Sequence, residues 1–343
     1  MPPNSSTMLF GSRSDIKVKV NTMGDGNSGL QGVGIAQFME RRGRTVREAC
    51  GVLWHTVEGG LYVSVPHQLK LTLPGDELVS FLWKGHATGV RYPSTHSPGL
   101  PSGLYELTAP VYSFSNVHRN FKAKIRKGQE NCQIVELEAP YLLKHGLALN
   151  LKTMKRQNRY DAEFGAENNW RRLVGAIAMT PCIRVYGALV EGNLAAYAIT
   201  CREDGWLHIL HRMSRDEYLD HCPNHVLDYT ITQEINTDPN VRAVSMGYAS
   251  LVADSGGLHE YKTRLGYNFS PHNSVIRLHP VAGAILLNRL TRRLLAAAHV
   301  WRKDDSRISK VEAVLQGAEM SRNAGGRRVS ANETNPDRAV STQ

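Results

Sequence analysis

The chain lacks the cysteine patterns of small disulfide-bonded or zinc-stabilised proteins. Its 343 residues include five cysteines, which are scattered and form neither a Cys-x-x-Cys pair nor a Cys/His cluster at zinc-finger spacing. We therefore expect a reducing, cytoplasmic setting and no bound metal.

Long apolar runs are also missing. The most apolar stretch near the end, residues 281–300, is interrupted by three arginines, so no membrane span is expected. The N-terminus has no basic segment leading into an apolar core, and the sequence has no Gly-x-Ser-x-Gly nucleophile elbow. These absences favour a soluble cytoplasmic protein and leave a covalent serine mechanism unsupported.

What is present is typical of a globular chain that is long enough for two domains or two halves. Hydrophobic residues make up 41% of it, charged residues 21%, and the formal net charge is +10. This positive charge admits an anionic partner, which could be nucleic acid, a phosphorylated cofactor or an anionic membrane surface. Charge alone does not choose among them.

Both ends of the chain are polar. We expect a flexible N-terminal segment over residues 1–34, with one possible short strand at residues 16–20, and a polar, largely disordered tail over residues 303–343. The folded part is expected to lie between these two segments.

The second half of the chain has the clearest sheet signal. Residues 183–190, 194–201 and 206–212 alternate as strands and are joined by short turns at Gly192 and Gly205. A helix from Pro223, a strand at 241–246, a helix at 257–265 and a strand at 268–278 follow. In the first half we expect strands at 61–65, 90–92, 104–107 and 133–137, and helices at 74–83, 115–128, 140–159 and 162–179.

This pattern predicts an α/β (α+β) fold with a mixed, mostly antiparallel sheet and helices on both faces. Ligands of such sheets tend to bind where the carboxyl ends of neighbouring strands part. The loops after Arg212 and Met246 are therefore the predicted pocket.

Four short segments of the second half point to a known family: residues 185–189 with 192–197, Pro223-Asn224-His225-Val226-Leu227, Met246-Gly247, and Tyr261-Lys262 with Gly266-Tyr267. In these segments the chain resembles the Gcn5-related N-acetyltransferase (GNAT) fold, and more closely its FemAB-like branch of peptidoglycan-bridge aminoacyltransferases. The first half is similar to the degenerate amino-terminal half of the same proteins at Arg119, residues 125–128, Thr153 and residues 156–159. The resemblance implies two tandem GNAT-like halves, a degenerate one at 35–160 and one with the cleft at 161–302.

The resemblance also implies transfer of an acyl or aminoacyl group to an amine. Relatives of the bridge-forming branch use aminoacyl-tRNA and a cell-envelope precursor, and acetyltransferase relatives use acyl-CoA. This chain departs from the acetyltransferase pattern, because residues 220–224 stand where a glycine-rich pyrophosphate loop is expected. A Gln-x-x-Gly-x-Gly/Ala match at residues 31–36 is interpreted as chance, since too few residues precede it to form the required strands.

Amide formation needs a neutral amine, a proton acceptor and a donor to the developing oxyanion. Lys262 is the candidate donor, and the alternative is a solvated helix lysine. Tyr248 and Ser250 are candidates for orienting substrate or relaying a proton, or else are turn hydroxyls. These three are the predicted catalytic residues.

Other residues are candidates for binding substrate. Asn224 binds substrate or caps its helix, Tyr261 accompanies Lys262, and His211 is a possible base. His208 and His211, three apart in a strand, are expected to face opposite sides and so form no metal pair. Four arginines are candidates for binding the phosphates of a nucleotide or tRNA: Arg119, Arg126, Arg156 and Arg159. The alternative for these side chains is that they are only solvated.

Other readings stay open. The alternative function is a catalytically degenerate GNAT-fold protein for ligand binding or assembly; a nucleic-acid-binding protein is disfavoured, because no binding module is recognised. The acceptor is expected to be an amine-bearing small molecule or cell-envelope precursor. The apolar and basic segment 281–302 either docks on the domain, which we prefer, or touches an anionic membrane. The sequence predicts no oligomeric state.

Overall fold

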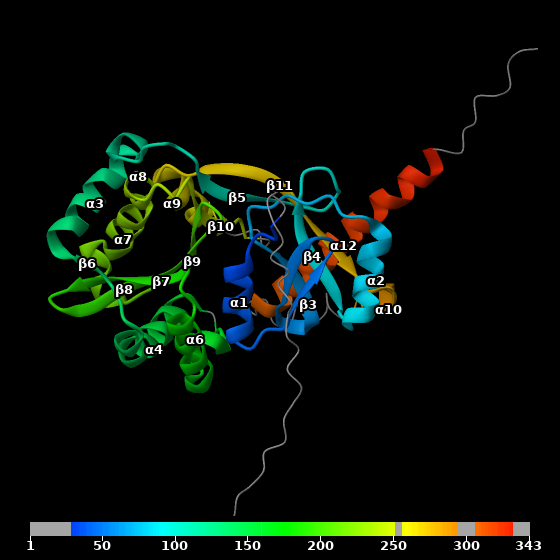
Figure 1. Cartoon of the computed structure of the whole chain (residues 1–343), viewed down its shortest axis with the longest axis horizontal. Coiled ribbons are helices and arrows are strands. Elements are labelled where there is room, and N and C mark those ends of the chain that lie inside the picture. The colour runs from blue at the N-terminus through cyan, green and yellow to red at the C-terminus, as the bar shows by residue number, and fades with distance from the viewer. Residues whose placement is uncertain (1–28, 159, 251–255, 292, 294–305, 332–343) are drawn as a thin grey trace, which may run out of the picture.

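The computed structural model describes residues 29–158, 160–250, 256–291, 293 and 306–331. All its strands form one 11-stranded sheet in the order β1-β2-β3-β4-β11-β5-β10-β9-β8-β7-β6 (Figure 1). The strands are β1 (Val46–Ala49), β2 (Val52–Thr56), β3 (Leu61–Val65), β4 (Gly89–Ser94), β5 (Leu100–Leu107), β6 (Gln133–Glu136), β7 (Ile183–Val190), β8 (Asn193–Glu203), β9 (Trp206–Ser214), β10 (Ala243–Tyr248) and β11 (Asn268–Leu278).

Helices cover both faces of this sheet. The α-helices are α1 (Val33–Arg41), α2 (Gly75–Gly85), α3 (Arg119–Asn131), α4 (Ala139–Arg156), α5 (Ala162–Gly165), α6 (Glu167–Met179), α7 (Pro223–Thr232), α8 (Glu234–Thr237), α9 (Gly256–Arg264), α10 (Pro280–Leu286) and α12 (Ser306–Ala331). Short 3₁₀ turns are η1 (Glu58–Gly60), η2 (Phe114–Asn116) and η3 (Asp216–His221). The predicted fold class, a mixed and mostly antiparallel sheet with helices on both faces, is confirmed.

Two parallel strand pairs give the sheet an internal symmetry. β3 runs parallel to β4, and β9 runs parallel to β10, whereas the other neighbouring strands are antiparallel. An antiparallel meander lies outside each parallel pair, β1-β2-β3 on one side and β6-β7-β8-β9 on the other. The two halves of the molecule therefore repeat one strand arrangement.

The halves exchange strands at their junction. β11, the last strand in the sequence, lies between β4 and β5, and β5 lies between β11 and β10. Figure 1 shows β5 and β11 side by side across the middle of the molecule. Neither half completes its sheet without a strand from the other.

Apolar side chains fill the layers between sheet and helices. α1, α4 and α6 share one buried cluster with β8, and α3 and α7 share another with β10 on the opposite face; Figure 1 shows α4 and α6 on one side of β7 and β8 and α3 and α7 on the other. A smaller third cluster holds α2 against β2, β3 and β4. Each large apolar side chain that is buried this way contributes about 1.5–3 kcal/mol.

The start of α1 binds a carboxylate from the second half. The backbone N–H groups of Gly34 and Ile35 donate to the carboxylate of Glu203, the latter at 3.0 Å, and the Gly32 N–H donates to Asp204 at 2.8 Å. These amides belong to the glycine pattern of residues 31–36. In the described structure their anion is therefore internal, as suits a helix amino terminus.

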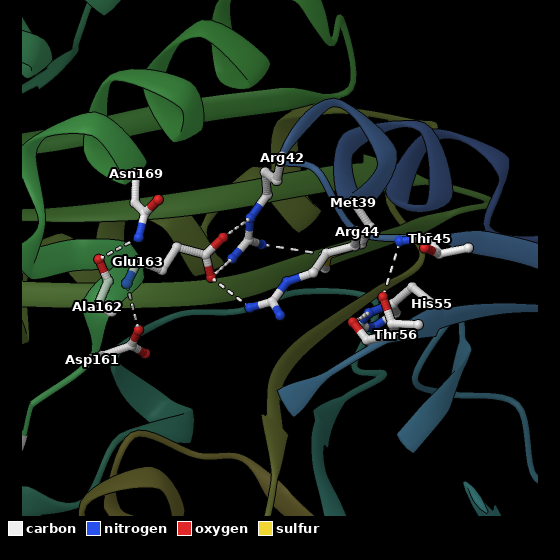
Figure 2. Close-up of polar contacts among 10 residues, drawn as sticks. All are labelled: Met39, Arg42, Arg44, Thr45, His55, Thr56, Asp161, Ala162, Glu163 and Asn169. Atoms are coloured by element: carbon white, nitrogen blue, oxygen red, sulfur yellow. Dashed lines mark hydrogen bonds and ion pairs between the residues drawn. The ribbon is translucent and has the colours of Figure 1, made fainter. Parts of the chain in front are cut away.

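In addition to the contact of the α1 amides with Glu203 and Asp204, an ion pair beyond α1 also connects the two halves. Arg42 and Arg44 both reach the Glu163 carboxylate of α5, as Figure 2 shows. Burial alone would raise the pKa of Glu163, but the hydrogen bonds and charges of the two arginines hold it below its usual value. Nearby, burial lowers the pKa of His55 to about 4.

Some predicted elements differ from the structure. α1, β1 and β2 were not predicted, and α3 begins at Arg119 because His118 caps it. The predicted disordered tail over 303–343 is wrong for residues 306–331, which form α12. The reason is packing: Ala313, Leu315 and Ala318 are buried, and α12 contacts β11. The possible strand at 16–20 lies outside the described residues.

The segment 281–302 is described only in part. α10 ends at Leu286, and residues 292 and 294–302 lie outside the described structure. Val281, Ile285 and Leu290 are exposed. No described helix combines the length and the apolar character needed to cross a membrane. Docking and membrane contact remain open predictions for this segment.

Candidate functional site

The candidate site lies where β9 and β10 part. The two strands pair only from Ala243↔Trp206 to Ser245↔His208; beyond this point β9 follows β8 and β10 follows β5. α7 follows β9, after η3, and α9 follows β10. The loops after Arg212 and Met246, predicted from the sequence, therefore flank the carboxyl ends of diverging strands.

Lys262 is buried at this point. Its side chain comes from α9, the residue is 6% exposed, and Nζ donates to the Met246 carbonyl at 2.7 Å and the Tyr248 carbonyl at 3.4 Å. The pairing of β10 with β5 is interrupted between Ser245 and Tyr248, and Gly247 has a φ of 73°. This irregular strand end presents its carbonyl groups to the lysine, and the alternative of a solvated helix lysine is wrong.

The surroundings weaken the charge of Lys262. Burial is the main cause and the nearby Arg212 the second, and together they lower the pKa of Lys262 to about 8. The Nζ atom lies 4.2 Å from the ring centroid of Tyr105, which favours the ammonium form. An amine with a pKa near neutrality can donate a hydrogen bond or a proton to a developing negative charge.

A buried polar network continues from Lys262 to α7. The hydroxyl of Tyr261 donates to Asp228 Oδ2 at 2.7 Å and lies 3.1 Å from the Asn224 carbonyl. Asp228 is fully buried and forms an ion pair with Arg212, whose guanidinium lies over the Tyr261 ring at 4.6 Å. The Arg212 charge that lowers the pKa of Lys262 is therefore held in place by one buried carboxylate.

Asn224 belongs to the same network. Its side-chain Nδ2 donates to Ser214 Oγ at 3.1 Å, and Arg156 also reaches this hydroxyl at 3.1 Å. The capping position of α7 is Cys222, without a side-chain cap hydrogen bond, and Asn224 lies inside the helix. The helix-cap alternative for Asn224 is therefore wrong.

Other predicted site residues lie away from Lys262. The hydroxyl of Tyr248 donates to the His67 carbonyl at 2.8 Å, and burial raises the pKa of this tyrosine. Ser250 is exposed at the end of a described segment. The ring of His211 packs 4.6 Å from that of Phe164, in the layer of α5. The structure brings together Lys262, Tyr261 and Asn224, and it leaves Tyr248 and His211 on the opposite face of the sheet.

The prediction that His208 and His211 face opposite sides is wrong. His208 pairs with Cys201 and His211 with Ile199, so a β-bulge at Leu210 places both histidines on one face. Among the described residues, no three histidine, cysteine or acidic side chains are grouped to hold a metal ion.

The predicted basic residues divide into two groups. Arg156 forms an ion pair with Asp216. Arg119 and Arg126 are exposed on α3, and no carboxylate of the described residues pairs with either. Arg159 lies outside the described residues. Of the predicted basic residues that the structure describes, the two without a paired carboxylate thus lie on α3.

Three important residues were not predicted: Arg212, Asp228 and Tyr105. Asp228 did leave a sequence signal, because it is a lone acid in the otherwise apolar run Val226-Leu227-Asp228-Tyr229 and such a residue is rarely buried unless it is paired. Tyr105 left none, since it reaches Lys262 only through the long-range pairing of β5 with β10.

No protein-family model matches the chain, and no curated protein matches its sequence. Solved structures do match. The C-terminal domain of a protein assigned as a lysylphosphatidylglycerol synthetase from Agrobacterium fabrum is 11% identical, with a TM-score of 0.52, over 78% of this chain and 91% of that one. L-PGS from Bacillus licheniformis is 10% identical, with a TM-score of 0.51, over 82% of this chain and 91% of that one.

FemX is also similar, at 12% identity and a TM-score of 0.49, over 71% of this chain and 91% of the other. At such identities the similarities to the first two structures show the fold alone. That fold is the GNAT-like fold which the sequence predicts.

Proposed function

We propose that the protein transfers an acyl or aminoacyl group to an amine at the point where β9 and β10 part. The observation that carries this proposal is the buried Lys262, whose pKa of about 8 and position over Tyr105 suit a donor to a developing oxyanion. Tyr261, Asp228 and Arg212 act as positioning residues, because they hold the charge next to Lys262.

The reaction needs no covalent enzyme intermediate. The lone pair of a neutral amine attacks the carbonyl carbon of an ester or thioester, a C–N bond forms, and the C–O or C–S bond breaks. The nitrogen loses one proton and the leaving oxygen or sulfur takes one, so no proton is gained or lost overall. Lys262 donates a hydrogen bond to the carbonyl oxygen while it carries negative charge.

Two features of the surface favour aminoacyl-tRNA over acyl-CoA as the donor. First, α7 begins with Pro223, and the N–H groups of His225 and Val226 are directed to the Cys222 carbonyl. This helix start is a poor pyrophosphate cradle, since Pro223 has no N–H and the N–H groups of His225 and Val226 are already paired.

The second feature is the basic surface of α3. Gly128 of α3 lies so close to α7 that a Cβ atom there would be 2.7 Å from Val226 Cβ. The unpaired Arg119 and Arg126 therefore lie on a helix that packs directly against the start of α7. Such a surface suits the phosphate backbone of a nucleic acid.

The finer proposal follows the names of similar structures. A lysylphosphatidylglycerol synthetase and L-PGS share the fold, which supports a donor of aminoacyl type and an acceptor from the cell envelope. Acyl-CoA is the second donor to test.

The experiment is a transfer assay with purified full-length protein. Aminoacyl-tRNA prepared from total tRNA, or acetyl-CoA, is offered with amine acceptors that include cell-envelope precursors, and new amides are detected by mass spectrometry. We expect product with wild type and with Lys84→Met, an exposed lysine of α2, but not with Lys262→Met. Binding of donor without any amide product would instead support the non-catalytic alternative.

A further inference from the structure

Two cysteines meet in the buried cluster that α1, α4 and α6 share with β8. Cys182 directly precedes β7, and Cys201 lies in β8, which pairs with β7. The Cys201 thiol donates a hydrogen bond to Cys182 Sγ, and the two sulfur atoms are 3.6 Å apart. The two thiols therefore form a dithiol that the proposed transfer does not use.

Backbone hydrogen bonds fix this position. The Arg202 N–H donates to the Cys182 carbonyl at 2.8 Å, and the Ile183 N–H donates to the Thr180 carbonyl at 3.0 Å. Cys182 is thus held beside Cys201 by the pairing of β7 with β8. The sulfur atoms of a disulfide are about 2.05 Å apart, so a bond between these two requires an approach of about 1.5 Å from their present separation.

The surroundings favour the thiolate form of Cys182. The hydrogen bond from Cys201 lowers the pKa of Cys182 and raises that of Cys201. The positive charge of Arg41 also lowers the pKa of Cys182, whereas burial and Glu203 oppose this effect. By contrast, burial raises the pKa of Cys50. Because the thiolate is the reactive form of a cysteine, Cys182 is the nucleophile of the pair.

The two thiols differ in exposure. Cys201 is fully buried, whereas Cys182 is half-buried, so a small oxidant reaches Cys182 first. On one side, Cys182 Sγ packs against α1, since a Cβ atom at Gly34 would lie only 2.6 Å from it. This close packing disfavours a bulky adduct on Cys182, such as a mixed disulfide with glutathione, while the Cys201 sulfur is already in contact.

We infer that Cys182 and Cys201 are a site of reversible oxidation by peroxide, at which a disulfide forms within the chain. The Cys182 thiolate attacks hydrogen peroxide, an S–O bond forms and the O–O bond breaks. The products are Cys182 sulfenic acid and hydroxide, which is protonated to water.

The second step closes the disulfide. The Cys201 thiol loses its proton and its sulfur attacks the Cys182 sulfur, so the S–S bond forms and the S–O bond breaks. The hydroxide that leaves takes up the proton and becomes a second water molecule. The two sulfur atoms together lose two electrons, and the peroxide gains them.

The disulfide would form at a contact between the two halves. Glu203, two residues after Cys201, accepts hydrogen bonds from the α1 amides of Gly34 and Ile35, and Cys182 packs against Gly34. Disulfides of reducing compartments are mostly transient and redox-sensing, which agrees with a bond that opens again. The inference is independent of the proposed transfer, because it concerns a different chemistry at a different place.

The test is peptide mapping of reduced full-length protein after exposure to hydrogen peroxide and alkylation of the remaining thiols. Trypsin cuts after Arg184, so Cys182 lies in the peptide 173–184 and Cys201 in the peptide 185–202. We expect these peptides, linked and lighter by two hydrogen atoms, to be the main product of Cys182, and dithiothreitol should restore both thiols. Unreacted Cys182, or Cys182 sulfinic acid without linked peptides, would overturn the inference.

Variants separate the roles of the two cysteines. In Cys201→Ala the disulfide cannot form, and we expect peroxide to oxidise Cys182 severalfold more slowly and to give sulfinic acid, which dithiothreitol does not reduce. Cys50→Ala is the matched control, because Cys50 is also half-buried, and it should form the linked peptides as wild type does. If Cys201→Ala does not fold, Cys201→Ser takes its place. An unchanged rate and unchanged products in a folded Cys201 variant would contradict the assignment.

Discussion

The two parallel strand pairs, β3/β4 and β9/β10, occupy equivalent places in the two halves, but different elements follow them in the chain. After β10 the chain forms α9, which carries Lys262 into the strand end. After β4 the chain turns directly into β5 and forms no helix. The repeat therefore reproduces the sheet but not the element that holds the buried lysine.

The first half uses its corresponding region in another way. There the space near β4 is filled by Tyr248 and His272, which belong to strands β10 and β11 of the later sequence. The repeated architecture therefore provides two comparable positions in the sheet. The connection after each parallel strand pair determines which side chains are placed there. We propose that transfer belongs to the second half.

The largest expected effect comes from replacing the lysine. We expect Lys262→Met to lower the transfer rate by about 10²–10³-fold, because it removes one oxyanion donor. Its thermal midpoint should not fall, since burying an amine is itself costly. The matched change in the first half is Lys84→Met, in the helix between β3 and β4. Similar losses in the two variants would remove the asymmetry between the halves.

Breaking the buried ion pair should reduce stability. Asp228→Asn leaves Arg212 without its carboxylate, and we expect a loss of about 3 kcal/mol in the free energy of unfolding, because one partner of a buried pair is removed. Urea denaturation measures this. Glu167→Gln, in an exposed pair on α6, is the control and should change little. A stable Asp228→Asn protein would show that Arg212 is solvated in solution.

The pH dependence of stability should distinguish wild type from Lys262→Met. The folded pKa of Lys262 is about 8 and the unfolded value about 10.4, so the unfolded chain binds more protons between these values. Wild-type stability should therefore rise relative to the variant as the pH increases from about 8 to about 10.4, by at most about 3 kcal/mol. Parallel curves for the two proteins would mean that Lys262 has an ordinary pKa.

The smallest expected effect concerns the basic surface of α3. The double change Arg119→Gln and Arg126→Gln should weaken tRNA binding severalfold and reduce the slope of log affinity against log salt by about 1.4–1.8. Arg156→Gln should have less effect, because Arg156 is already paired with Asp216. Filter binding at several salt concentrations measures both. An unchanged slope in the double variant would place the tRNA elsewhere or exclude it.

Local signals explain what the sequence could predict. The strands of the second half are joined by turns at Glu191-Gly192 and Asp204-Gly205, where all four residues have positive φ, and such two-residue turns are recognisable. The hairpin between β1 and β2 turns at Cys50 and Gly51, also with positive φ. A cysteine at this position is not a typical turn residue, so this hairpin was missed.

Long-range pairing explains what the sequence could not predict. Lys262 was found from its neighbourhood in the sequence, but its burial depends on the interrupted pairing of β10 with β5. The side assignment of His208 and His211 failed for one bulged residue, which reverses the alternation of a strand. Arg91 and His272 meet only because β11 lies beside β4.

The exchange of β5 and β11 also has a consequence for synthesis on the ribosome. β4 has an open edge until β11, which ends at Leu278, has left the exit tunnel. At typical elongation rates of about 5–20 residues per second, this edge waits on the order of ten seconds or longer. The nascent chain thus carries a strand with one unpaired edge through this part of its translation, and chaperone binding would protect the chain most during this interval.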